Sequence, residues 1–345
     1  MNHVHISSPV YTEHKDWFWP LDDNGKACVC GSAACDWDGD KAKRCWFTDY
    51  LPDFNFQLQA ARDFSVNNAL KWIKDTGADG LRLDAVKHIE DQWLLDLRSR
   101  VKTEIESSTG EHVYMVGETF SGNKDLLRYY VNPTKMLDGQ FDFPLRAELI
   151  NAVLTRSATV TMKELDAFLS SNEKFYGSGI MSTFLGNHDV PRAIHFAEDT
   201  PVWGDAWDGG KDKSWSDPPV PLPAGTSAFE RLASAYTILL TTPGVPLIYY
   251  GDEIGMPGAG DPDNRRMMQW DNYTEGQLLL RERLKKLTAV RAAHPALRHG
   301  ERTALSATAE TLAYKRVSGS DTVYVVVNRS DAPQQVGSLP SGMLK

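Results

Sequence analysis

The stretch Gly80-Leu81-Arg82-Leu83-Asp84 is a short apolar run that closes with a carboxylate. Two further runs close in the same way, Val116-Gly117-Glu118 and Gly186-Asn187-His188-Asp189. An ionised side chain inside an apolar strand is costly, so we expect each acid to lie where its strand ends. The carboxyl ends of parallel strands meet at one end of a β/α barrel. The pattern therefore predicts that Asp84, Glu118 and Asp189 share one polar pocket.

Helical and strand patterns alternate around these acids. An apolar repeat predicts a helix from about residue 62 that ends at Gly77, just before the strand 80–84. A second repeat, from Trp93 to Ile105, predicts the helix before the strand 113–116. Further predicted strands are 136–143, 180–186 and 245–250, and further predicted helices are 144–155, 162–175, 227–241 and 277–293. The alternation predicts an α/β fold of parallel βα units.

After about residue 300 the pattern changes to short alternating runs, 311–317 and 322–328, which are typical of an antiparallel β module. The segment 1–55 is irregular and rich in Asp, Gly, Trp and Cys, as expected of a loop subdomain. A second irregular segment, 190–225, carries several Trp and Pro residues. We expect it to form a loop above the barrel mouth.

The composition restricts the classes of partner. The chain has 345 residues, a net charge of −9 and 41% hydrophobic residues, enough for a large core. The acidic balance, without a local Lys/Arg cluster, argues against nucleic acid and favours a neutral substrate. The longest apolar run is interrupted by Thr and Pro, so no membrane span is predicted. We expect a monomer.

All four cysteines, Cys28, Cys30, Cys35 and Cys45, fall in one short segment. Their spacing lacks the C-x-x-C pairs of most zinc sites, so it favours two disulfides over a four-thiolate zinc site. Two disulfides indicate an oxidising compartment, and we expect an extracellular or periplasmic protein. The nearby acidic run 36–40 has its glycine at the wrong position for a calcium loop of the EF-hand type, so a solvated turn is expected.

Together these segments resemble the α-amylase family of glycoside hydrolases over nearly the whole chain. The family's short signatures occur in order, and 251–256 and 261–266 also look like family segments. The signatures are Asn2-His3, Leu51-Pro52-Asp53-Phe54-Asn55, Gly80 to His88, Gly117-Glu118 and Phe184-Leu185-Gly186-Asn187-His188-Asp189. The resemblance implies a (β/α)8 TIM barrel and a retaining mechanism, in which two carboxyl groups lie about 5 Å apart across the scissile bond.

The resemblance also assigns roles. It implies that Asp84 is the nucleophile, held ionised by Arg82 on the same strand face. Glu118 is then the general acid and base, in surroundings expected to raise its pKa, and Asp189 stabilises the transition state. Sugar contacts are implied for His3, Arg82, Lys87, His88, Asn187 and His188.

A structural calcium ion is also implied by the resemblance. Its expected ligands are Asn2, Asp53 and the carbonyl of His88, since calcium prefers hard oxygen donors. The segment Tyr249-Tyr250-Gly251 offers no basic residue of the kind that binds chloride in some family members. We therefore expect calcium and no chloride.

The resemblance divides the chain into three parts. Residues 1–58 correspond to the end of barrel strand 3 and an inserted loop subdomain, 59–300 to barrel units 4 to 8, and 301–345 to a partial C-terminal β domain. The chain opens inside the signature that ends the third barrel strand, so the first two to three strands are expected to be missing, together with an aromatic residue that stacks on sugar. This suggests an N-terminally truncated bacterial-type α-amylase, from a partial gene or a misplaced start.

The leading hypothesis is an endohydrolase of α-1,4-glucans such as starch, glycogen and maltodextrins. Residues 51–55, which correspond to what the family counts as its fifth signature, are close to the form found in members that cut α-1,6 bonds or cyclic dextrins. A neopullulanase-like or cyclomaltodextrinase-like hydrolase, or a transglycosylase, therefore stays open. A non-catalytic relative is disfavoured because all three acids remain. A lone Asp at a strand end is more often a helix N-cap, but three acids in such contexts favour an enzyme.

Overall fold

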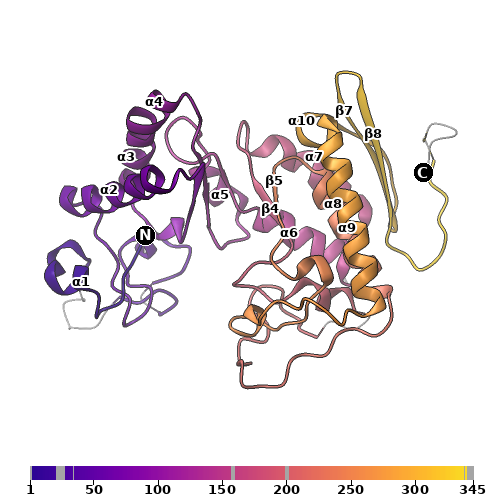
Figure 1. The fold of residues 1–345 in the computed structure, drawn as a ribbon, viewed down its shortest axis with the longest axis horizontal. Coiled ribbons are helices and arrows are strands. Elements are labelled where there is room, and N and C mark those ends of the chain that lie inside the picture. Colours follow the sequence, from indigo (N-terminus) through magenta and orange to yellow (C-terminus); the bar gives the residue numbers. More distant parts are fainter. Residues whose placement is uncertain are drawn as a thin grey trace. The chain divides into compact units, whose positions relative to one another are not determined.

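The computed structural model of the chain describes residues 2–20, 28–33, 35–156, 160–198, 202–337 and 339 (Figure 1). Its contacts divide it into two compact units. Unit 1 is Met1–Phe141 with Ser178–Met181, and unit 2 is Asp142–Gly177 with Ser182–Lys345. The dividing point after Phe141 lies inside the predicted barrel segment, and the predicted three-part division stays a prediction. Residues 338 and 340–345 of the predicted C-terminal module lie outside the described residues.

Unit 1 is built from parallel βα steps that follow an irregular N-terminal region. Its strands pair in the order β1-β2-β3, and both pairings are parallel, as predicted. The strands are β1 Gly80–Leu83, β2 Tyr114–Gly117 and β3 Gly139–Gln140. The helices are α1 Pro9–Glu13, α2 Gln59–Thr76, α3 Asp91–Val101, α4 Ser107–Thr109 and α5 Lys124–Tyr130, with 3-10 turns at Lys15–Trp17, Asp40–Lys43 and Val86–His88 and a π-helix at Lys102–Glu106.

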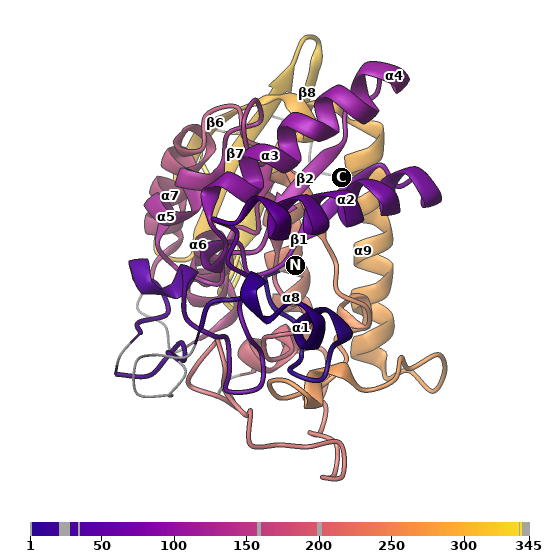
Figure 2. The same ribbon diagram turned by 90° about the vertical axis from the view of Figure 1, so that its left-hand side faces the viewer.

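The local sequence explains where these elements begin and end. Helix α2 ends at Gly77, which adopts the left-handed conformation (φ +67°) that glycine tolerates best, as predicted. Apolar side chains of α2 and α3, such as Leu70 and Leu97, pack with β1 and β2 into one core. Figure 2 shows α2 and α3 lying together beside these strands. The aromatic rings of Phe54, from the signature 51–55, and of Phe56, which follows it, belong to the same core.

The irregular region before α2 corrects the prediction of two disulfides. Cys28 and Cys45 form a disulfide, whereas Cys30 and Cys35 are free and buried. The Sγ atoms of these two thiols lie 3.4 Å apart, in contact but not bonded.

Unit 2 combines a helical layer with two small sheets. Strands β4 Ser182–Phe184 and β5 Val245–Leu247 pair in parallel, and β6 Glu301–Ala307, β7 Thr311–Ser318 and β8 Asp321–Asn328 form an antiparallel sheet. The helices are α6 Phe143–Leu149, α7 Met162–Phe175, α8 Ser227–Thr241, α9 Glu275–Ala293 and α10 Pro295–His299, with a π-helix at Ile150–Leu154 and 3-10 turns at Ala193–Ala197, Asp252–Ile254 and Asp263–Arg265. The predicted C-terminal antiparallel module is therefore confirmed.

Helix α8 is the centre of the unit 2 core. Most of its side chains are buried, and it packs against α9 and against β8 of the antiparallel sheet (Figure 1). Helices α7 and α9 begin with capping boxes, in which Thr161 pairs with Glu164 and Thr274 with Gln277. In the described part of the chain, none of the helices is long and apolar enough to cross a membrane.

Three strands are shorter than predicted, for local reasons. The run 136–143 keeps only β3, because the Met136 N–H donates to the Asn132 carbonyl in a turn and Asp142 caps α6 by accepting from the Leu145 N–H. The runs 180–186 and 245–250 keep only β4 and β5. An apolar run alone does not set strand length, because each residue also needs a pairing partner.

Candidate active site

Arg82 and Asp84 form the first part of the site, at the end of β1. The side chains of residues i and i+2 lie on the same face of a strand, and Arg82 Nη1 donates to Asp84 Oδ1. Both side chains stay open to solvent, with 32% and 52% exposed. The pairing that the family resemblance implied, on the strand face that the two residues share, is therefore present. It places a fixed positive charge against a carboxylate that remains accessible.

Glu118 lies beside Asp84 because of the strand register. Leu83 pairs with Gly117, so each acid directly follows one member of that pair. The Glu118 N–H donates to the Leu83 carbonyl (2.7 Å), and the Glu118 side chain accepts from the Ala85 N–H (3.0 Å). Glu118 is buried, whereas Asp84 is exposed. The two carboxylates thus occupy one edge of the sheet in different surroundings.

Ala85 has an unusual backbone conformation between these acids. Its φ of +49° lies in the left-handed region, which costs a non-glycine residue about 1–2 kcal/mol. In this conformation its N–H points at the Glu118 carboxylate, and the chain turns into the 3-10 turn Val86–His88. Such strain persists only where the surrounding contacts hold it, and it is common at functional sites.

The three predicted metal ligands, Asn2, Asp53 and the His88 carbonyl, lie close together. Asn2 Nδ2 donates to Asp53 Oδ1 (2.5 Å) and to the His88 carbonyl (2.8 Å). Asp53 is buried, and its Oδ2 has no hydrogen-bond partner in the described part of the chain. Burial and the neighbouring Glu90 raise the pKa of Asp53 well above its usual value. His3 is tied to this group through Nδ1, 2.7 Å from Asn2 Oδ1, and burial lowers its pKa despite the charge of Asp84.

Lys87 and the ring of His88 point into the protein. Lys87 Nζ donates to Asp38 Oδ1 (2.6 Å) and to the Phe120 carbonyl (2.9 Å). The His88 ring is buried, with Nδ1 3.1 Å from the Ala42 carbonyl, and burial lowers its pKa to about 4. Both residues therefore connect the loop region to β1, and their predicted contact with sugar stays a prediction.

The acidic turn 36–40 is largely exposed, as expected, but Asp38 also makes contacts with two other segments. It accepts from Lys87 and also from Ser121 Oγ (2.9 Å). Partial burial acts to raise its pKa, but the hydrogen bond and charge of Lys87 outweigh this effect, and the pKa of Asp38 is lowered.

The predicted residues of unit 2 form a second group, in the loop after β4. The Asp189 N–H donates to Asn187 Oδ1 (2.8 Å), and His188 Nε2 lies 3.3 Å from Asp189 Oδ2. Arg265 holds this group from a distant loop, with Nη2 3.4 Å from Asp189 Oδ1 and Nε donating to the His188 carbonyl (3.0 Å). The sequence reasoning assigned Arg265 no role. The family-like segment 261–266 was the only signal for it.

Buried polar groups hold the loop after β4 in place. Arg192 Nη1 pairs with Asp252 Oδ1 (2.8 Å), and Asn264 Nδ2 donates to the Val190 carbonyl (2.9 Å). A Cβ atom at Gly186 would lie 2.3 Å from Asp252 Oδ2, so only glycine lets the loop approach this carboxylate. Asp84 and Glu118 belong to unit 1 and Asp189 to unit 2, and a pocket shared by all three acids stays a prediction.

Comparisons with known proteins agree with this arrangement. The family model for the alpha-amylase catalytic domain matches residues 7–206. A cyclomaltodextrinase of Geobacillus thermopakistaniensis is 28% identical over 298 residues, covering 84% of this chain and 43% of that protein. A cyclomaltodextrin glucanotransferase of Bacillus sp. is 26% identical over 313 residues, covering 86% and 38%. This chain thus spans about two fifths of these curated relatives.

A solved structure gives the same result for the fold. The α-amylase of Geobacillus thermoleovorans, complexed with acarbose, has a TM-score of 0.76 and 27% identity, and the match covers 98% of this chain and 67% of that chain. The family match alone covers more than half of the sequence. With its signatures, its parallel βα steps and its C-terminal antiparallel sheet, the chain belongs to the alpha-amylase family of glycoside hydrolases, whose catalytic domain is a (β/α)8 barrel.

Proposed function

We propose that this chain carries the catalytic groups of a retaining hydrolase that cleaves internal α-1,4-glucosidic bonds of starch, glycogen and maltodextrins. The observation that carries the proposal is the pair Asp84 and Glu118 at neighbouring strand ends, one exposed beside Arg82 and the other buried on the Ala85 N–H. Two carboxyl groups in different surroundings suit the two roles that a retaining mechanism needs.

The reaction has two steps. Asp84 attacks the anomeric carbon while Glu118 protonates the leaving oxygen, which gives a covalent glycosyl-enzyme and frees one sugar end. Glu118 then takes a proton from water, and the water oxygen displaces Asp84 from the anomeric carbon. Arg82 orients the Asp84 carboxylate through its hydrogen bond to Oδ1. Asp189, with Asn187 and His188, stabilises the positive charge that develops on the sugar ring.

Two substitutions test these roles. Asp84→Asn removes the nucleophile, and Glu118→Gln removes proton transfer, which is worth about 10²- to 10⁴-fold in rate. Both variants should lose hydrolysis of a chromogenic maltooligosaccharide while keeping the wild-type circular dichroism. Glu111→Gln, at an exposed acid that precedes β2, is the matched control and should keep full activity. Wild-type rates in a folded Asp84→Asn variant would end the proposal.

A second candidate activity, on cyclic dextrins or by transfer to a sugar acceptor, is favoured by the relatives. The two curated relatives described above are a cyclomaltodextrinase and a cyclomaltodextrin glucanotransferase. The same glycosyl-enzyme serves water or sugar as acceptor, so products must decide. Faster cleavage of β-cyclodextrin than of starch, release of panose or maltotriose from pullulan, or formation of longer oligosaccharides from maltotriose would each favour this alternative.

We also propose that Asn2, Asp53 and the His88 carbonyl hold a calcium ion. These oxygen donors suit calcium, and among the described residues the buried carboxylate of Asp53 has no hydrogen-bond partner for Oδ2, as expected where a cation completes the site. The side-chain amide of Asn2 donates hydrogen bonds to the Asp53 carboxylate and to the His88 carbonyl, whose oxygens a cation would bind. The ion would tie the loop region to β1.

Calcium titration tests this site. An ion at 100 times its Kd stabilises a protein by about 2.7 kcal/mol, so EDTA should lower the Tm and added calcium restore it. Asp53→Asn should abolish the calcium response, and Asp63→Asn, on the surface of α2, should retain it. An equal response in both variants would place the ion elsewhere.

A further inference from the structure

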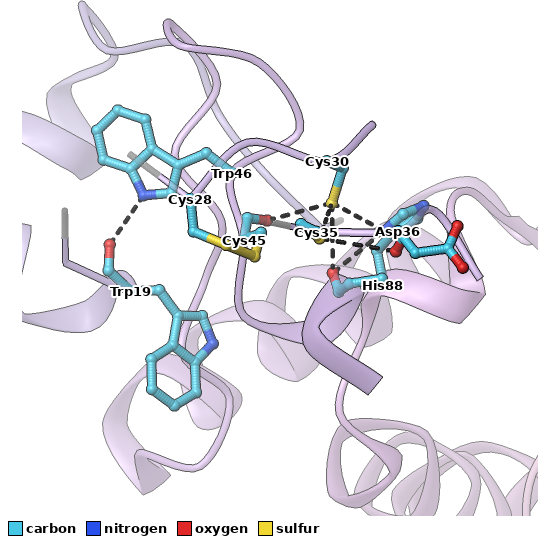
Figure 3. The surroundings of a disulfide bond; sticks show 9 residues. Trp19, Cys28, Cys30, Cys35, Asp36, Cys45, Trp46 and His88 are labelled. Atoms are coloured by element: carbon cyan, nitrogen blue, oxygen red, sulfur yellow. Dashed lines mark hydrogen bonds between the residues drawn. A yellow bond between two sulfur atoms is a disulfide. The ribbon is translucent and has the colours of Figure 1, made fainter. Parts of the chain in front are cut away.

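The four cysteines of unit 1 form a cluster that the proposed activity does not use. The Sγ atoms of Cys28, Cys35 and Cys45 all lie within 4.8 Å of one another, and Cys30 Sγ lies 3.4 Å from Cys35 Sγ. Figure 3 shows the disulfide next to Cys30 and Cys35, with His88 on the side of Cys30. Three of the sulfurs thus lie together and the fourth, of Cys30, is in contact with one of them, although the sequence pattern had suggested two separate pairs.

This cluster is the local core of the loop around it. Cys30, Cys35 and Cys45 are buried with Ala42, and Cys28 packs against them. Apart from the cysteines, Ala42 is the one residue of this small cluster among the described residues. In the reduced chain, four sulfhydryl groups and a methyl group bury little apolar area, so a further link is needed to order the loop.

The spacing of the sulfurs fits a tetrahedral metal ion. Zinc binds thiolates at about 2.3 Å, so the sulfurs of a tetrahedral site lie about 3.8 Å apart. The Cys30–Cys35 contact at 3.4 Å is close to this value, and the sulfurs of Cys28, Cys35 and Cys45 lie within 4.8 Å of one another, with Cys28 and Cys45 joined as a disulfide. A single disulfide leaves Cys30 and Cys35 as buried thiols in contact, whereas one ion would use all four sulfurs.

We propose that Cys28, Cys30, Cys35 and Cys45 bind one structural Zn²⁺ in the reduced chain. The thiols lose their protons to the solvent as the ion binds, and no electron transfer is involved. The disulfide and the zinc site use the same sulfurs, so the two states exclude each other.

The zinc site would act on the rest of unit 1 through His88. The imidazole Nδ1 of His88 lies 3.7 Å from Cys30 Sγ, and its carbonyl accepts from Asn2. The ion therefore fixes the loop against the 3-10 turn that follows Asp84. It also removes the reason to expect an extracellular or periplasmic protein, because that expectation depended on two disulfides and thiolate sites persist in reducing compartments.

Metal counting on the full chain is the decisive experiment. The protein is purified with a thiol reductant and without chelators, and its metals are counted by mass spectrometry. About one zinc per chain is expected. Replacement by Co²⁺ should give the strong near-ultraviolet absorption of thiolate-to-cobalt charge transfer. A reduced, folded protein with no zinc, or peptide mapping that finds a Cys30–Cys35 disulfide under these conditions, would overturn the proposal.

Two variants assign the ligands. Cys30→Ser should lower zinc retention at least tenfold, whereas Asp36→Asn, in the adjacent acidic turn, should keep about one zinc per chain. Loss of zinc from Asp36→Asn but not from Cys30→Ser would mean that carboxylates bind the ion, and would refute the site. If Cys30→Ser does not fold, a mercurial reagent added to the wild type decides, because zinc release should require modification of the four thiols. Release without thiol modification refutes it.

Discussion

The acids of the two units are held in place by different means. Glu118 is fixed to β1 through the main chain, by the Leu83 carbonyl and the Ala85 N–H, and Asp84 is held by Arg82 two residues away. Asp189 instead follows its strand on a loop, and its partner Arg265 is 76 residues further along the chain. The first arrangement follows from strand register. The second requires that several loops are already folded.

This difference makes the unit 2 site depend on buried polar contacts. Arg192 joins three segments, since it pairs with Asp252 and donates to the carbonyls of Asn264 and Tyr250. His195 lies in the same layer and accepts from the Gly258 N–H (3.1 Å). Because these groups are buried, removing one leaves its partners unsatisfied in a region of low dielectric.

The largest effect should come from Arg192→Met, which tests whether this layer supports unit 2. Removing one partner of a buried ion pair costs about 3–5 kcal/mol, because the Asp252 carboxylate then stays buried without its counter-charge. Denaturant unfolding measures the loss. Lys211→Met, which breaks an exposed pair with Asp208, should cost at most about 1 kcal/mol. Equal losses in the two variants would contradict the comparison.

A pH effect of similar size should come from His195. Burial lowers its pKa to about 4, with Asp263 opposing this shift and Arg192 adding to it. The unfolded chain, with a pKa near 6.5, binds the proton first, so stability is lost as the pH falls from about 6.5 to about 4. The loss over this range is about 3 kcal/mol.

Denaturant unfolding at pH 7 and pH 4.5 checks this contribution. His195→Gln keeps an acceptor for the Gly258 N–H but does not titrate, so its free energy of unfolding should fall less than that of the wild type. His5→Gln, at an exposed position, should follow the wild type. A wild-type pH slope in His195→Gln would mean that other groups cause the acid sensitivity.

The sequence predicted most successfully what local patterns encode. The bounds of α7 and α8 match the predictions 162–175 and 227–241, because apolar repeats and, for α7, the capping box of Thr161 mark them. The two-residue period of a strand put Arg82 and Asp84 on one face, and the family resemblance implied that they pair, as they do. The grouping of Asn2 with Asp53 and His88 came from the family resemblance, because these residues are far apart in sequence.

Contacts between loops were beyond the sequence. Nothing in the pattern linked Arg265 to Asp189 or Lys87 to Asp38, because each pair meets only when two irregular segments have folded. The cysteine spacing favoured two disulfides, yet the loop brings three of the sulfurs together and the fourth into contact with one of them. The strands β3, β4 and β5 were predicted too long because pairing partners set strand length, and these are not visible in a single run.

Arg265→Ala sharpens the comparison at the level of catalysis and depends on the proposed function. Without the Arg265 side chain, Asp189 loses a partner from a distant loop. A misplacement of about 1 Å at a catalytic group costs about 10²-fold in rate. We expect kcat to fall by about this factor. The free energy of unfolding should change by less than about 1 kcal/mol, because Arg265 is partly exposed.

Steady-state kinetics with a soluble maltooligosaccharide distinguish a positioning role of Arg265 from a purely structural role. A positioning role predicts a fall in kcat with little change in KM, and partial recovery in Arg265→Lys. Arg283→Ala, on the exposed face of α9, is the matched control and should leave both constants unchanged. A rise in KM with unchanged kcat would show that Arg265 acts on substrate binding and not on Asp189.

The smallest effect should come from Ala85→Gly, which probes the main-chain arrangement of unit 1. Glycine removes about 1–2 kcal/mol of left-handed strain but adds about 0.4–1 kcal/mol of entropy to the unfolded chain, so a net gain of at most about 1 kcal/mol is expected. Ala69→Gly, inside α2, should instead lose about 1 kcal/mol. Opposite signs in denaturant unfolding would show that Glu118 and its neighbours hold Ala85 in a strained conformation. A loss of stability in both variants would mean that the turn after Asp84 is not strained, and that the main chain positions Glu118 without storing energy.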